Sequence, residues 1–195
     1  VTLTALAVDN GSDQVIFLSA DLVAVHDYLL DDIRDQVRRL DPAVPVQKIL
    51  MHVTHTHTGP GFGRLRVDSA PDPAGDKDHG QEYRAFLVDQ AAAAVVEAYR
   101  GRREGGIAYG YGYAVVSHNR RVVYFDDTSL RPGKKEAGFF QNGHGVMYGD
   151  TKDKNFSHYE GGADHFVNLL FTFDGQDELT GAIINLAATS QNSEL

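Results

Sequence analysis

Apolar residues recur along this chain with two periods. Stretches that alternate apolar and polar positions, or are apolar throughout, are typical of β-strands, whereas stretches with apolar residues every three or four positions predict amphipathic α-helices. The expected strands cover residues 2–8, 15–19, 46–54, 107–117, 121–125, 166–173 and 179–189, and the expected helices cover residues 26–40 and 81–99. The polar segments 9–13 and 174–178 predict hairpin turns.

Two long segments carry no periodic pattern. Residues 59–80 are polar and dense in proline and glycine, and residues 126–160, with five glycines, are expected to form a long loop region. A loop of that length in a compact domain is usually functional or an insertion. With hairpins at both ends and helices between strands, the pattern predicts a mixed α/β (α+β) fold with a partly antiparallel mixed sheet and flanking helices.

Composition indicates one substantial core and excludes some partners. The chain has 195 residues, of which 42% are hydrophobic, and residues 1–195 are expected to be a single domain. A formal net charge of -9, with no run of Lys and Arg, argues against a nucleic-acid partner. No apolar run approaches the roughly 18 residues of a transmembrane segment. Because Leu195 follows directly on an apolar strand pattern, the domain is expected to continue past it.

Three histidines lie where an expected strand runs into a turn. His52, His55 and His57 precede Gly59-Pro60-Gly61. If strand alternation continues, His55 and His57 share one face, with side chains about 7 Å apart or less. Two neutral imidazoles so placed can share a zinc ion, and without cysteine the remaining ligands must be His, carboxylate, Tyr or water. The spacing favours His55 and His57 as metal ligands, the alternative being polar residues that hydrogen-bond the turn.

Residues 117–121 form a second polar cluster, between two expected strands. An arginine there can hold a carbonyl or carboxylate with its two-pronged guanidinium, although a polar turn with a surface arginine pair is equally compatible. The preceding tyrosines, at 109, 111 and 113, are typical of one face of a half-buried sheet. No nucleophile elbow, phosphate-binding loop or dinucleotide fingerprint is present, so a self-contained serine triad is not supported.

Four segments in order carry a family resemblance. They are Ala20-Asp21-Leu22-Val23, Thr54-His55-Thr56-His57-Thr58-Gly59-Pro60-Gly61, Ser117-His118-Asn119-Arg120-Arg121 and residues 181–189. Together they resemble the N-terminal catalytic domain of the neutral/alkaline, non-lysosomal ceramidases, over almost the whole chain. The resemblance implies a zinc-dependent amidase that splits the N-acyl bond of ceramide, with a lipid or small-molecule substrate and a secreted or periplasmic location. The segment with the two histidines is the specific part of the match.

The resemblance also implies roles for single residues. His55 matches a zinc ligand, His57 lies beside the site as a catalytic residue, and Arg120 contacts the reacting group. The family has a second histidine after a strand like residues 185–189, where this chain has Ser190. Because the family's later Glu, Tyr and Ser fall beyond Leu195, the 195-residue chain alone is not expected to be a competent ceramidase. The alternative is a non-catalytic or altered member that binds a lipid or glycan in the same cleft.

Overall fold

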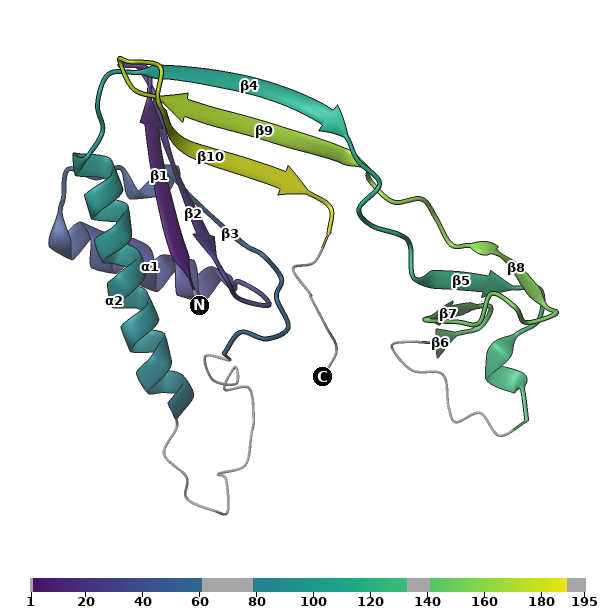
Figure 1. Cartoon of the computed structure of the whole chain (residues 1–195). Helices are drawn as coiled ribbons and strands as arrows, with labels where there is room; N and C mark the ends of the chain where they lie inside the picture. The colour runs from purple at the N-terminus through teal and green to yellow at the C-terminus, as the bar shows by residue number, and fades with distance from the viewer. Residues whose placement is uncertain (1, 61–78, 133–140, 189–195) are drawn as a thin grey trace. The chain divides into compact units, whose positions relative to one another are not determined.

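A computed structural model describes residues 2–60, 79–132 and 141–188 (Figure 1). The described residues divide into two compact units. The first covers residues 2–60, 79–105 and 174–176, and the second covers residues 106–132, 141–173 and 177–188. Within these ranges, no helix has the length and apolar content needed to cross a membrane.

The first unit is a three-stranded sheet packed against two helices (Figure 1). Its elements are β1 (Leu3–Asp9), β2 (Gln14–Ala20), α1 (Asp27–Leu40), β3 (Ile49–Val53) and α2 (His79–Arg100). β2 is the central strand, antiparallel to β1 and parallel to β3. The expected hairpin and both helices are confirmed. β3 begins later than expected because residues 46–48 form a 3₁₀ turn, closed by the Lys48 N–H on the Pro45 carbonyl (2.8 Å), and cannot pair with β2.

The core of this unit lies between the sheet and the helices. Every second residue of β2 faces the helices, and α1 presents apolar residues four positions apart. The side chains of this core that are at most 1% exposed are Ile16, Leu18, Ala20, Leu22, Leu29, Ile33, Val37, Ile49, Leu87, Ala91, Ala92 and Val95. Burial on this scale holds β2 and β3 in register, and His55 and His57 follow the end of β3.

The second unit contains two antiparallel sheets. One has the order β10-β9-β4, from β4 (Gly106–Tyr113), β9 (Phe166–Phe173) and β10 (Leu179–Leu186). The strands expected at 107–117 and 179–189 end early because β9 runs out: Tyr113 pairs with its first residue, Phe166, and Leu186 with Val167. Together with the first unit, these sheets confirm a mixed α/β fold that is partly antiparallel.

The other sheet has the order β6-β7-β5-β8. Its strands are β5 (Arg121–Tyr124), β6 (Gln141–Asn142), β7 (Gly145–Met147) and β8 (Phe156–Tyr159), with a 3₁₀ helix at Thr128–Leu130. The expectation of one long loop over residues 126–160 is therefore wrong. These strands are two to four residues long, too short for a visible period, and β7 and β8 form by pairing with the two edges of β5.

The β4 tyrosines are more exposed than expected. Tyr109, Tyr111 and Tyr113 are 69%, 67% and 66% exposed, so the predicted half-buried face is wrong for the part of the chain that the structure describes. Pairing with β9 satisfies one edge of the β4 backbone, but no side chain of β4, β9 or β10 is among the buried residues. Strand pattern alone does not reveal what covers a sheet.

An ion-pair cluster supports the turn after β5. The Arg131 guanidinium donates two 2.7 Å hydrogen bonds to the Asp126 carboxylate and one of 2.5 Å to Asp153. The same guanidinium lies 4.7 Å from the ring centre of Tyr124. The hydrogen bond from Arg131 is the main cause that lowers the pKa of Asp126 from 3.8 to about 2. The pKa of Asp153 is also lowered, first by the Asn155 backbone N–H and then by Arg131.

We expect this cluster to make the second unit sensitive to acid. A carboxyl whose pKa is lower in the folded than in the unfolded chain stabilises the fold above its unfolded pKa, and the stabilisation is lost as the pH falls through its folded pKa. For Asp126 this window runs from 3.8 down to about 2. Arg131→Gln should make the unfolding temperature fall less steeply as the pH drops across that window. Arg39→Gln is the control: it loses a bond to the neutral Gln36, so its unfolding temperature should fall as steeply as that of the wild type. An equally steep fall in Arg131→Gln would contradict the assignment.

Candidate functional site

The histidine loop, residues 54–60, follows β3. The Thr54 N–H still donates to the Ala20 carbonyl (3.1 Å), but the chain then turns, with His55 at φ 55°. Non-glycine residues seldom adopt this left-handed conformation. The His55 and His57 rings have centroids 5.2 Å apart and planes at 68°. Their expected proximity is confirmed, but its expected cause is wrong: strand alternation stops at Val53, and the turn at His55 brings the rings together.

Asp21 anchors this loop from the end of β2. Because β2 and β3 are parallel, with Ala20 opposite Val53, the residues that follow them lie side by side. The Asp21 carboxylate accepts the Thr54 hydroxyl at 3.2 Å. A Cβ on Gly59 would lie only 2.8 Å from the Asp21 carbonyl oxygen, so the loop can pass this close because residue 59 has no side chain. No role was predicted for Asp21, since the parallel pairing that brings it to Thr54 is not visible in the sequence.

Threonines turn the histidines outward. Thr56 is only 9% exposed, its hydroxyl lies 3.0 Å from that of Thr58, and it also accepts the Thr58 N–H at 3.3 Å. With Thr56 directed inward, its two neighbours His55 and His57 are exposed. The loop therefore presents both imidazoles to solvent and to any ligand that approaches.

The two imidazoles fit one metal ion by spacing but do not complete a ligand set. A tetrahedral zinc about 2.0–2.1 Å from each nitrogen would place the two ring centres about 5 Å apart, close to the observed 5.2 Å. A catalytic zinc takes about three protein ligands. Across residues 2–60, 79–132 and 141–188, no three His, Asp or Glu side chains form a group that could hold a metal. Ser190, where the family has a further ligand, lies outside the described residues.

Arg120 lies in the second unit, immediately before β5. Its Nη1 donates to the Tyr148 hydroxyl at 2.8 Å, and its guanidinium carbon lies 5.2 Å from the Tyr148 ring centre. Asn119 shapes the turn by accepting the Arg121 N–H at 2.8 Å. Arg121 forms an ion pair with Glu160, which lowers the pKa of that carboxyl. Of the two neighbouring arginines, Arg120 is thus the one that the described residues leave without a carboxylate.

The resemblance implies that Arg120 acts at the same site as His55, but the two residues belong to different units, and their approach stays a prediction. Tyr148 was missed by sequence analysis. Its pairing with Arg120 spans 28 residues, and it falls within a segment expected to be loop. The only local signal was its neighbour Gly149.

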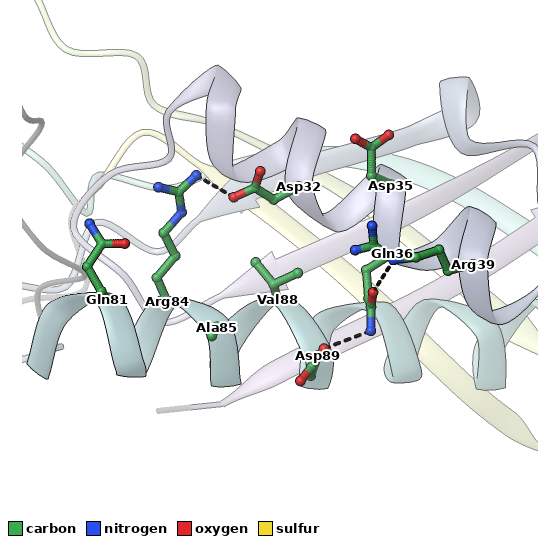
Figure 2. Close-up of a pocket in the computed structure, with 9 residues that line it drawn as sticks. All are labelled: Asp32, Asp35, Gln36, Arg39, Gln81, Arg84, Ala85, Val88 and Asp89. Carbon is green, nitrogen blue, oxygen red and sulfur yellow. Dashed lines mark hydrogen bonds and ion pairs between the residues drawn. The ribbon is translucent and has the colours of Figure 1, made fainter.

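A groove of about 370 Å³ lies between α1 and α2, and several of its polar groups pair with one another. Figure 2 shows Arg84 on α2 forming an ion pair with Asp32 on α1, and Gln36 on α1 donating to Asp89 on α2 at 2.8 Å. These pairs link the two helices. None of the predicted site residues lines the groove, so it is not the candidate site.

Comparison with known proteins supports the fold. No family model and no curated protein matches the chain. Among solved structures, the chain is similar to neutral ceramidase from Pseudomonas aeruginosa, at 18% identity and a TM-score of 0.50, over 89% of this chain and 23% of that chain. It is also similar to a ceramidase complexed with C2, at 17% identity and a TM-score of 0.53, over 91% of this chain and 24% of that chain. The chain thus spans about a quarter of these neighbours' length, and it has a ceramidase-like mixed α/β fold.

Proposed function

We propose that the chain supplies part of the site of a ceramidase-like, metal-dependent hydrolase, which cleaves the amide bond of an N-acyl sphingoid or related lipid. The observation that supports this most is the His55–His57 pair, at a spacing that suits one metal ion, in a ceramidase-like fold. When bound, a zinc ion would polarise the amide carbonyl and activate a water molecule.

The chain's own residues have separate tasks in this proposal. His55 and His57 offer imidazole nitrogens, and Asp21 holds their loop through Thr54. Arg120, whose charge no described carboxylate neutralises, stabilises the oxyanion that develops as the amide carbonyl is attacked. A guanidinium suits this task because it stays charged and presents several donors in one plane.

A second candidate function is favoured by the ligand count. The described residues bring two imidazoles together but no group of three metal-binding side chains. An altered member of the same fold could use the exposed histidines and arginine to bind a lipid or glycan without hydrolysing it. The two functions differ in whether metal binding and amide hydrolysis depend on the histidine loop.

Zinc binding tests the proposal directly. We expect His55→Ala and His57→Ala each to weaken the zinc affinity of the chain by at least about 10–100-fold, the loss that follows even from disturbing a ligand's support. Titration calorimetry on the metal-free protein measures the affinity, and His118→Ala, an exposed histidine of the second unit, is the control.

Zinc affinity that neither loop substitution changes would contradict the metal site. Release of fatty acid from a short-chain ceramide, abolished by His55→Ala, would establish hydrolysis and would also show that these 195 residues suffice for it. Ceramide binding without hydrolysis and without zinc would favour the second candidate.

A further inference from the structure

Tyr148 combines three features that are unusual for an exposed side chain. It has φ 58°, a left-handed conformation that a bulky non-glycine residue rarely adopts. Its hydroxyl accepts a 2.8 Å hydrogen bond from Arg120, and its backbone N–H donates to the Arg120 carbonyl at 2.7 Å. Strained backbone of this kind persists only where surrounding structure imposes it, and it is concentrated at functional sites. His55, in the histidine loop, has the same left-handed conformation.

Contacts of the two residues that follow Tyr148 with β5 hold Tyr148 in this position. A Cβ on Gly149 would lie 2.2 Å from a Val122 methyl carbon, so the chain is pressed against β5 immediately after Tyr148. The Tyr124 hydroxyl then donates to the Asp150 carbonyl at 3.0 Å. Gly149 and Asp150 thus both contact β5, and these contacts keep the Tyr148 side chain beside Arg120.

The charge of Arg120 is oriented without being neutralised. In the described part of the second unit, Arg121 pairs with Glu160, and Arg131 pairs with Asp126 and Asp153. Arg120 is bonded to a neutral phenol instead. A phenol that accepts a hydrogen bond from a guanidinium keeps its own O–H free to donate, and the guanidinium keeps further N–H donors.

We propose that Tyr148 and Arg120 together form a two-donor receptor for a carboxylate or for the oxyanion of an amide under attack. The Tyr148 hydroxyl donates to the same oxygen that Arg120 binds, in addition to positioning the guanidinium. This inference rests on the proposed function for the identity of the oxyanion, but the receptor itself is a property of the second unit. Both side chains are exposed and therefore accessible to a ligand.

Binding of octanoate tests the receptor without requiring hydrolysis. We expect Tyr148→Phe, which keeps the ring and loses the hydroxyl, to weaken octanoate affinity about 10-fold, the effect of one hydrogen bond to a charged group. Arg120→Ala should weaken it at least as much. Tyr159→Phe, an exposed tyrosine on β8, is the control and should bind as the wild type does. Titration calorimetry gives the affinities.

The variant Tyr148→Gly distinguishes a role of Tyr148 in binding from a purely structural role. Glycine adopts the left-handed conformation without steric cost, and this relief offsets the greater conformational entropy that glycine gives the unfolded chain, so the variant should weaken octanoate binding with little change in the unfolding temperature. Loss of thermal stability alongside binding would overturn the proposal.

The octanoate titrations also test the receptor independently of the proposed function. Wild-type affinity in Tyr148→Phe, with affinity lost in Arg120→Ala, would overturn the role of Tyr148 and leave that of Arg120. Wild-type affinity in both, or no octanoate binding by the wild-type protein, would overturn the receptor, whatever the zinc titrations show at the histidine loop.

Discussion

In a hydrolytically active protein that contains this chain, Arg120→Ala should lower kcat for ceramide hydrolysis by about 100- to 1,000-fold, the usual effect of removing one donor to a developing oxyanion. KM should change little, because such an interaction forms mainly in the transition state. Arg120→Lys should recover only part of the rate, since a lysine keeps the charge but lacks the planar set of donors. Rates of fatty acid release from a short-chain ceramide measure both effects.

The neighbouring arginine provides the matched control. Arg121 differs from Arg120 in forming an ion pair with Glu160, so Arg121→Ala should change kcat little. Equal losses in Arg120→Ala and Arg121→Ala would indicate a general disturbance of the turn before β5. Full activity of Arg120→Ala would exclude it from the chemistry.

Gly149→Ala should destabilise the β6-β7-β5-β8 sheet by about 1–3 kcal/mol or more, the range for inserting an atom into a packed site. The new Cβ would lie 2.2 Å from the Val122 Cγ2 and 2.5 Å from the Tyr124 hydroxyl oxygen. Val122 and Tyr124 are 1% and 4% exposed, and neither can move aside without opening the sheet. Urea unfolding measures the loss.

Gly110→Ala is the control for that substitution. Gly110 lies in β4, where no described atom is within 4 Å of an added Cβ, so its substitution should change stability by less than about 0.5 kcal/mol. Gly149→Ala should also weaken octanoate binding, because relief of the clash moves the adjacent Tyr148 away from Arg120. Unchanged stability in Gly149→Ala would show that the turn can shift freely from β5.

Local pattern was enough for the elements that have a long apolar period. The helix from Asp27 to Leu40 and the strand from Phe166 to Phe173 were predicted to within a residue, because the first repeats apolar residues over several turns and the second is apolar at most of its positions. The two histidines were predicted from the chemistry and spacing of their side chains, and Arg120 from the family resemblance, and neither prediction needs tertiary structure. Whether they form one site remains a prediction.

Tertiary structure alone decided how these residues are held. β7 and β8 form because β5 offers them its two edges, and β6 then pairs with β7. Asp21 reaches Thr54 across 33 residues because β2 and β3 are parallel. The left-handed turns at His55 and Tyr148 are unfavourable in an isolated chain. They are held by contacts with β2 and with β5, which exist only after strands distant in sequence have paired. The sequence thus determined which side chains are candidates for a functional site and which segments form long elements, whereas long-range packing determined how those side chains are held.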